Sequence, residues 1–167
     1  MNEIVIKGTI TLKQGRDHSI KRFHPWIFSG GIQQTHGEPS DGDWVEVQDA
    51  KKTTVGFGHY QKGSITARIL VFGDEKPTSS IYYEKISNAF EQRIKTFTSS
   101  ESTNSYRLVH GEGDGLPGLI IDLYHDVAVL QAHSFGMQKD RAIIAVAIKE
   151  VFENRNAKLS AVYYKTL

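Results

Sequence analysis

The chain has 167 residues, 39% of them hydrophobic, and a formal net charge of +1. This length and hydrophobic content suffice for one ordinary globular domain or two small ones. A net charge so near zero excludes an overall field that attracts polyanions, so any nucleic-acid surface must be a local patch. The sequence contains no cysteine, which excludes disulfides, Cys-ligated zinc and a catalytic thiol.

The beginning of the chain does not resemble a targeting segment. Apolar residues alternate with polar ones from Met1 to Leu12, without the continuous apolar stretch of a signal peptide. No later run approaches the ~18 apolar residues that a membrane-spanning helix needs. We therefore expect a cytoplasmic protein without a membrane partner.

The first 73 residues are rich in β-type segments and turn residues. Turn sequences such as Gly37-Glu38-Pro39 and Gln61-Lys62-Gly63 separate short runs with strand character. The expected strands are Ile4 to Leu12, Trp44 to Gln48, Thr54 to Tyr60 and Ile65 to Val71. Their close spacing predicts a small β-barrel over residues 1–73.

A polar stretch follows the expected barrel. After Gly73 the sequence reads Asp-Glu-Lys-Pro-Thr-Ser-Ser, with no apolar residue. Such a composition is typical of a connecting segment. We predict a linker at residues 74–80 and a second domain at residues 81–167.

The second domain combines helical and β patterns. An amphipathic linking helix is predicted from apolar residues at roughly helical spacing: Ile81, Ile86, Phe90, Ile94 and Phe97. A polar loop at residues 98–105 precedes expected strands at 106–110, 119–124 and 127–131, a helix at 142–152 and a strand at 159–164. The fold class is therefore α+β, a small barrel followed by a helix and a small α/β sheet domain.

The expected last strand lies only a few residues from the end of the sequence. A strand in that place needs a neighbour on its far side, because an open sheet edge is prone to unwanted pairing. We expect the natural chain to continue past Leu167.

The segment from Lys21 to Gly31 concentrates cations and aromatic residues. That mixture can supply phosphate pairing and base stacking in one place. A structural interpretation stands beside it, in which Trp26, Ile27 and Phe28 fill the barrel while Lys21 and Arg22 are solvated. Both can hold residue by residue, and we assign Trp26 and Phe28 to the core.

Two blocks of the sequence resemble a known family. The first comprises His-Pro-Trp-Ile-Phe-Ser-Gly at residues 24–30, Gly42-Asp43-Trp44-Val45, Gly58-His59-Tyr60, Ser64-Ile65 and Arg68-Ile69. It resembles the PUA domain that opens the bacterial S-adenosylmethionine-dependent cytosine-5 methyltransferases of large-subunit ribosomal RNA. The second block, Tyr106 to Asp122, resembles the start of the EEHEE-like middle domain of that family. The resemblance covers nearly the whole chain.

The resemblance implies that this chain is the RNA-engaging N-terminal part of such an enzyme, with ribosomal RNA as partner. In that family the middle domain leads into a Rossmann-like domain, for which the resemblance implies S-adenosylmethionine as cofactor. Methylation of cytosine carbon-5 needs a thiolate that adds to the ring, and this sequence has no cysteine. We therefore expect no catalytic or cofactor-binding residues here and no activity of the fragment alone. One departure is Gln61-Lys62-Gly63, where relatives often carry a proline.

The expected RNA contacts are basic residues of the first domain. The Lys21 to Gly31 segment and the Tyr60 to Ser64 turn both belong to the family-like blocks, and we expect them to converge at one end of the barrel. The predicted RNA-binding residues are Lys21, Arg22, His24, His59, Lys62, Lys51 and Lys52.

The glycine-rich block contains two motifs that imitate other sites. Residues 113–118 match the G-x-G-x-x-G phosphate fingerprint, but a β-type run follows where that site needs a helix, and Pro117 removes an amide donor. We therefore predict a tight turn between strands. His110, Glu112 and Asp114 alternate like metal ligands, but the interleaved glycines favour a bent backbone, so no metal is expected. The zinc deaminases, which share a His-x-Glu pair, are excluded because they need cysteines.

Two other functions remain open from the sequence. One is a free-standing PUA-type RNA-binding module in ribosome assembly, which the length of the natural reading frame would distinguish. The other is a regulatory or protein-interaction part of a metabolic enzyme. An RNA-binding assay with a salt titration would distinguish it, because phosphate contacts give a steep salt dependence.

Overall fold

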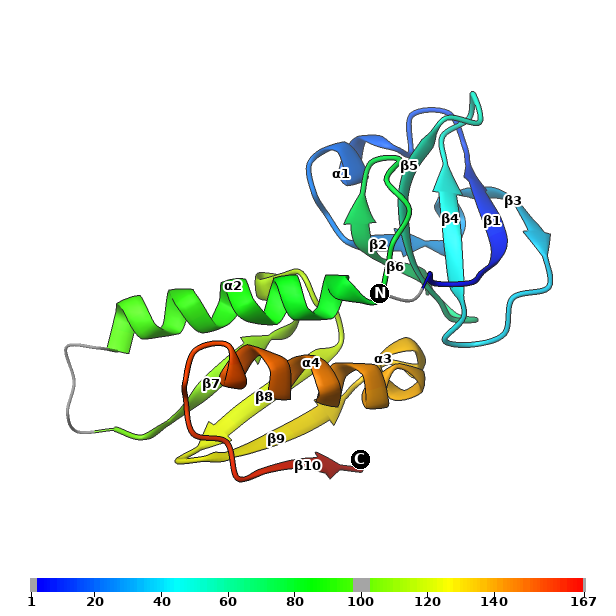
Figure 1. The fold of residues 1–167 in the computed structure, drawn as a ribbon. Helices are drawn as coiled ribbons and strands as arrows, with labels where there is room; N and C mark the ends of the chain where they lie inside the picture. The colour runs from blue at the N-terminus through cyan, green and yellow to red at the C-terminus, as the bar shows by residue number, and fades with distance from the viewer. Residues whose placement is uncertain (1–2, 98–102, 167) are drawn as a thin grey trace. The chain divides into compact units, whose positions relative to one another are not determined.

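The computed structural model describes residues 3–97 and 103–166. The chain divides into two compact units, Met1–Thr78 and Ser79–Leu167. Each unit has its own sheet, with six strands in the first and four in the second (Figure 1). The predicted α+β fold class is therefore confirmed.

The first unit is a curled sheet that forms a half-barrel (Figure 1). Its strand order is β2-β6-β5-β4-β1-β3, and neighbours are antiparallel except for the parallel pair β1 and β4. A short helix, α1 (His18–Lys21), and a 3-10 turn, η1 (Ser29–Gly31), flank β2. The strands are β1 (Ile6–Leu12), β2 (Trp26–Phe28), β3 (Ile32–Gly37), β4 (Trp44–Gln48), β5 (Thr54–Tyr60) and β6 (Ile65–Phe72).

Alternate side chains of these strands fill the concave side of the half-barrel. The core cluster consists of Ile10, Leu12, Ile20, Ile27, Val45, Val47, Ala67 and Ile69. The curl is tight where β5 meets β6, since a Cβ added to Gly58 would lie 2.0 Å from the carbonyl oxygen of Arg68. The register also shifts between Phe57 and Gly58. A glycine is required there because two backbones approach closely.

The predicted elements of the first unit match the structure unevenly. β4 and β5 have the predicted bounds, and β1 and β6 differ from them by one or two residues. Two strands were not predicted, β2 and β3. β2 has only three residues, and β3 reads Ile-Gln-Gln-Thr-His-Gly, with one apolar residue and little strand propensity.

The second unit is a four-stranded sheet with helices on one face (Figure 1). Its order is β10-β9-β8-β7; β7, β8 and β9 are antiparallel neighbours, and β10 pairs parallel with β9 after a crossover through a helix. In chain order the elements are α2 (Ser80–Phe97), β7 (Ser105–His110), η2 (Gly111–Asp114), β8 (Leu119–Tyr124), β9 (Val127–Ala132), α3 (Phe135–Lys139), α4 (Arg141–Glu153) and β10 (Ala161–Lys165).

The core of the second unit lies between the sheet and helices α2 and α4. Phe90 of α2 packs edge-to-face against Phe152 of α4, with 5.0 Å between ring centroids. The Tyr82 hydroxyl donates a hydrogen bond to Asp140 at 2.5 Å, and burial raises the pKa of Tyr82 well above its ordinary value. Other fully buried side chains include Ile86, Leu108, Leu119, Ile121, Leu130, Ile144 and Ile148.

The predicted elements of the second unit agree with the structure within two residues at most ends. The exception is α3, which was not predicted and which begins where the Ser134 side chain accepts a hydrogen bond from the Met137 amide. Most of the loop expected at 98–105 lies outside the described residues, since 98–102 are not described and β7 begins at Ser105. Among the described helices, none has the length and apolar character to span a membrane.

Candidate nucleic-acid interface

The predicted basic residues of the first unit fall into two groups at opposite ends of β6. Phe23, which follows Arg22, contacts the ring of Phe72 at the C-terminal end of β6 with 5.4 Å between centroids. Helix α1 contacts β5, which begins at Thr54, close after the turn that carries Lys51 and Lys52. Helix α1, the residues after it and this turn therefore lie together. We name Lys21, Arg22, Phe23, Lys51 and Lys52 the α1 surface.

Lys62 lies at the other end of β6. It belongs to the turn that leads into this strand at Ile65, and its amide donates to the Asp41 side chain at 2.7 Å. A strand of eight residues separates this turn from Phe72, a length of roughly 25 Å. The two segments meet, as expected, but at the Gly31 end of the longer segment, so Lys21 and Arg22 do not share the end of the barrel that carries Lys62. The segment from Lys21 to Gly31 runs along the barrel, and its Ser29 amide donates a hydrogen bond to the Ser64 carbonyl of the turn at 2.9 Å.

His59 must be removed from the predicted surface. Its side chain is buried, with an exposed fraction of 2%, and its ring packs edge-on against Trp44 with 4.5 Å between centroids. These two residues are directly opposite each other in β5 and β4. Strand register places His59 on the face of the sheet opposite to the core cluster, beside Trp44 and Arg68, where the packing of Trp44 against its ring leaves it buried.

The α1 surface exposes an aromatic ring among its cations. Phe23 is 73% exposed, and its backbone has φ of 60°. A positive φ is uncommon for a residue with a large side chain and persists only where the surroundings enforce it. Here the amides of Phe23 and His24 donate to the carbonyls of Ile20 and Ser19 at the end of α1. This turn holds the Phe23 ring beside the basic residues.

Lys21 has a carboxylate partner within the α1 surface. Its Nζ lies 2.6 Å from Asp17, whose side chain is 12% exposed. The ion pair lowers the pKa of Asp17 and raises that of Lys21. Because Asp17 already offsets the charge of Lys21, the charge available for phosphate comes mainly from Arg22, Lys51 and Lys52.

A row of rings extends from the α1 surface along the outer side of β2. His24, Trp26 and Phe28 alternate along the chain and contact each other edge-on, with centroid distances of 5.8 and 6.3 Å. The Nδ1 atom of His24 accepts the Trp26 amide at 3.2 Å, which leaves Nε2 to carry the proton of the neutral ring. We name these three residues the aromatic row.

The assignment of Trp26 and Phe28 to the core is corrected by these contacts. Phe28 is 52% exposed and Trp26 is half-buried, whereas Ile27 between them is 4% exposed and belongs to the core. Successive side chains of a strand point to opposite faces, so only one parity of this apolar triplet can face inward.

A pocket of about 310 Å³ opens at the aromatic row. Arg16 and Ser19 bring polar groups to its wall, and the rings of the aromatic row supply flat apolar surface. Its lining residues are Leu12, Arg16, Ser19, His24, Trp26, Ile27, Phe28 and Gly31. Arg16 and Ser19 were not predicted as site residues, although both lie within twelve residues of Trp26 in the sequence.

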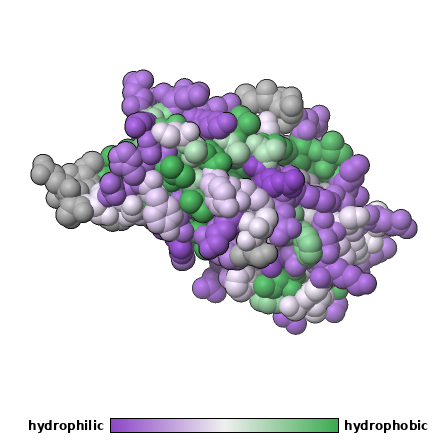
Figure 2. Space-filling model, turned by 90° about the horizontal axis from the view of Figure 1, so that it is seen from below, coloured by the Kyte–Doolittle hydropathy of each residue, from purple (hydrophilic) through white to green (hydrophobic). Residues whose placement is uncertain are grey.

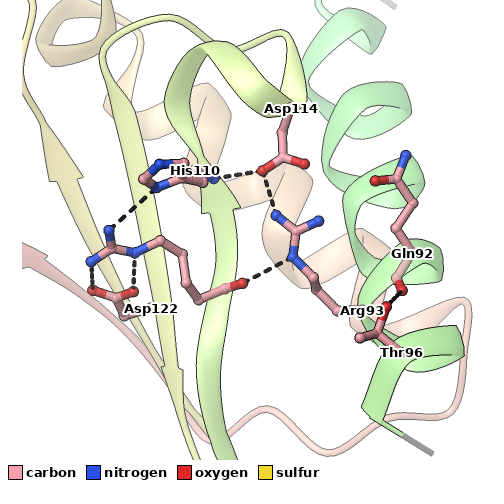
Figure 3. Close-up of polar contacts among 7 residues, drawn as sticks. Gln92, Arg93, Thr96, His110, Asp114 and Asp122 are labelled. Atoms are coloured by element: carbon pink, nitrogen blue, oxygen red, sulfur yellow. Dashed lines mark hydrogen bonds and ion pairs between the residues drawn. The ribbon is translucent and has the colours of Figure 1, made fainter.

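The glycine-rich block of the second unit is a turn between strands, as predicted. η2 and the glycines after it connect the antiparallel strands β7 and β8, and Gly115 and Gly118 have φ of 69° and 83°. The Asp114 carboxylate is committed to structure, since one oxygen accepts hydrogen bonds from Arg93 and from the His110 amide, each at 2.6 Å (Figure 3). Within the described ranges, no group of three or more His, Asp or Glu residues is placed to hold a metal ion.

Comparison with known proteins identifies the first unit. A family model described as a PUA-like domain matches residues 10–72. Residues 10–72 form a PUA-like domain. This match includes β2, the aromatic row and the turn with Lys51 and Lys52. The α1 surface and the pocket are therefore parts of the PUA-like domain.

Sequence relatives extend the similarity into the second unit. The chain is 33% identical over 144 residues to ribosomal RNA large subunit methyltransferase I of Klebsiella pneumoniae, covering 86% of this chain and 36% of that protein. The protein of the same name in Pseudoalteromonas atlantica is 35% identical over 148 residues, with coverages of 88% and 38%. The chain thus spans little more than a third of the length of these relatives. The resemblance found in the sequence is confirmed.

A solved structure shows the same fold. A candidate SAM-dependent methyltransferase from Streptococcus mutans superposes with a TM-score of 0.77 at 17% sequence identity, covering 96% of this chain and 40% of that one. The PUA-like domain and the second unit therefore occur in succession in another protein.

Proposed function

We propose that the PUA-like domain binds ribosomal RNA, and that the chain is the RNA-engaging part of an S-adenosylmethionine-dependent ribosomal RNA methyltransferase. The observation that carries the proposal is the continuity of the α1 surface with the aromatic row and its pocket. Cations that attract phosphate adjoin exposed rings that stack on bases, a combination typical of RNA-binding surfaces. The similarity to ribosomal RNA large subunit methyltransferase I supports the choice of RNA.

Each part of this surface has a distinct role in the proposal. Arg22, Lys51 and Lys52 contact phosphates, and the aromatic row with its pocket accepts an unpaired base. The overall charge of +1 supplies no long-range attraction, so affinity rests on these local contacts. Recognition should be mostly electrostatic and directed to RNA shape rather than to a long sequence.

A salt titration with charge variants tests the phosphate contacts. The variant Arg22→Ala/Lys51→Ala/Lys52→Asn removes three cations; asparagine is chosen at 52 because that backbone has φ of 65°, which asparagine tolerates. Lys21 is retained, since its removal would leave Asp17 without its partner. We expect weaker binding to a large-subunit ribosomal RNA fragment and a salt slope smaller by about 0.7 to 0.9 for each phosphate that the variant no longer neutralises.

Lys62→Ala is the matched control, because it removes an exposed lysine at the other end of β6. We expect it to change neither the affinity nor the salt slope. If Lys62→Ala weakens binding as much as the triple variant, the α1 surface is not the RNA site. Unchanged binding by the triple variant would contradict the proposal in the same way.

Catalysis is proposed to require residues other than these 167. Cytosine-5 methylation proceeds through a cysteine thiolate, which this sequence cannot provide. The glycine block cannot replace a cofactor loop, because its glycines form a turn between two strands instead of opening a helix. Calorimetry with S-adenosylmethionine should show no binding to this chain, and saturable micromolar binding would contradict that expectation.

A further inference from the structure

The sheet of the second unit has one face that its helices do not cover. Helices α2 and α4 lie on the same face of this sheet (Figure 1). Side chains that point to the other face alternate with fully buried ones, as Ile121 and Leu123 alternate with Asp122 and Tyr124. We define the open sheet face by Arg107, His110, Tyr124, Val129, Tyr163 and Lys165.

Strand register places these residues on one surface. Arg107 of β7 is opposite Asp122 of β8, Asp122 is opposite Val129 of β9, and Val129 is opposite Tyr163 of β10. These four residues form one row across the sheet. Tyr124 lies two residues beyond Asp122 on β8, and Lys165 lies two residues beyond Tyr163 on β10, so they belong to the neighbouring rows on either side. Arg107 and His110 also touch, with 3.3 Å between Nη1 and Nδ1 (Figure 3).

Two exposed tyrosines dominate this face. Tyr124 is 55% exposed and Tyr163 is 62% exposed. Tyr124 lies on β8 and Tyr163 on β10, with β9 between them and an offset of two residues along the strands. By the ordinary dimensions of a sheet, their Cα atoms are about 12 Å apart. Rings at this separation can each stack on a base of the same extended strand of RNA.

The charges of the face favour an anionic partner. The charged residues of β7 to β10 are Arg107, Lys165 and Asp122, with His110 in addition. Asp122, the acidic member, accepts hydrogen bonds from Nε and Nη2 of Arg107, at 2.8 and 3.2 Å. Lys165 is exposed, so the face presents net positive charge beside its two rings.

We propose that the open sheet face is a second RNA-contacting surface, which binds unpaired nucleotides. Tyr124 and Tyr163 stack on bases, while Lys165 contacts the backbone. The surface is distinct from the α1 surface and extends RNA engagement to the second unit. Two weak surfaces on one chain raise the total affinity for an RNA that reaches both.

The test uses the 167-residue chain and a short unstructured RNA oligonucleotide that carries a fluorophore. Tyr124→Ala/Tyr163→Ala should lower the affinity measured by anisotropy by between about 5- and 150-fold for each stacked base. Tyr124→Phe/Tyr163→Phe keeps both rings and should bind like the parent. Annealing the oligonucleotide to its complement should remove the difference between parent and alanine variant, because paired bases are not available for stacking.

The matched control is Ile143→Ala/Val146→Ala, which removes apolar side chains that are 40% and 55% exposed on α4 of the same unit. It should bind the oligonucleotide like the parent. All variants are also measured in the Arg22→Ala/Lys51→Ala/Lys52→Asn background. A tyrosine effect that persists there supports the open sheet face even if the α1 surface proves not to bind RNA.

Crosslinking and sedimentation complete the experiment. An oligonucleotide that contains 4-thiouridine should crosslink to β8 or β10 of the parent chain. Equal affinity of parent and alanine variant, together with crosslinks confined to the first unit, would overturn the proposal. So would a parent that self-associates through this face and becomes monomeric in the alanine variant, because the occupant would then be a second copy of the chain.

Discussion

At the scale of single residues, the direction of a side chain decides whether a functional residue type can act. The sequence marks residues 24–28 as unusual through their aromatic content, but three consecutive apolar residues do not reveal which parity faces inward. Pairing with β6 makes that choice, and it places Ile27 inside and Phe28 outside. His59 shows that a position opposite to the core need not be exposed, since this ring lies on the outer face of the sheet and is nevertheless buried beside Trp44.

Substitutions at two neighbouring positions of β2 should therefore have opposite effects. Ile27→Ala should lower the free energy of unfolding by about 2 to 5 kcal/mol, because it leaves a cavity in the core cluster. Phe28→Ala should change it by less than about 1 kcal/mol but weaken RNA binding, since the exposed ring belongs to the aromatic row. Urea denaturation and RNA anisotropy measure the two effects. Equal destabilisation by both substitutions would contradict the orientation of β2.

At the scale of elements, prediction succeeded where a periodic pattern extends over a whole strand or helix. β4, β5 and β8 have the predicted bounds because apolar residues recur there between clear turn residues. β2, β3 and α3 were missed because they are short or polar and owe their conformation to neighbouring elements. Local propensity is weak for such segments, and tertiary contacts decide their structure.

The turn between β8 and β9 should make the second unit sensitive to acid. The Asp126 carboxylate accepts hydrogen bonds from Ser160 Oγ at 2.5 Å and contacts Lys158 and His125 at 2.9 and 3.0 Å. These partners hold the pKa of Asp126 far below its ordinary value of 3.8. A carboxylate with a lowered pKa adds stability above its ordinary pKa, and that stability is lost as the pH falls further.

We therefore expect the free energy of unfolding of the second unit to fall as the pH decreases from about 5 to 2. Asp126→Asn should lower stability at neutral pH and make this pH dependence shallower. Urea denaturation at several pH values compares the two proteins. Parallel pH profiles for parent and variant would show that Asp126 does not contribute to the acid sensitivity.

At the scale of the whole molecule, two ordered motifs carried more information than any single residue. The family-like blocks near residues 24–69 and 106–122 predicted a PUA domain and a similarity to ribosomal RNA methyltransferases. The comparisons confirm both the PUA-like domain and the similarity. The composition of the candidate site could be predicted in part, since Arg22, Lys51 and Lys52 came from sequence. Its shape could not, because only the strand order shows which turns share an end of the half-barrel.

Division of the chain after residue 78 tests whether its two compact units are independent domains. We expect residues 1–78 and 79–167 to fold when produced separately, since each unit has its own sheet and buried core. Amide chemical shifts of each piece should match those of the intact chain except close to the cut. On the face drawn in Figure 2 hydrophobic patches are interspersed among hydrophilic residues, and we expect each piece to remain monomeric. A piece that remains unfolded would contradict the prediction.

The parallel pairing of β10 with β9 has a consequence for the order of events during translation. The sheet of the PUA-like domain needs no residue after Phe72, whereas the sheet of the second unit lacks its outer strand until Lys165 has been made. Helices α3 and α4 separate β9 from β10 in the sequence. Pairing of β10 with β9 therefore requires the closure of a long loop, and such non-local pairing is slow. On a translating ribosome the first unit can therefore close while the second is still an antiparallel three-stranded intermediate whose β9 edge remains open.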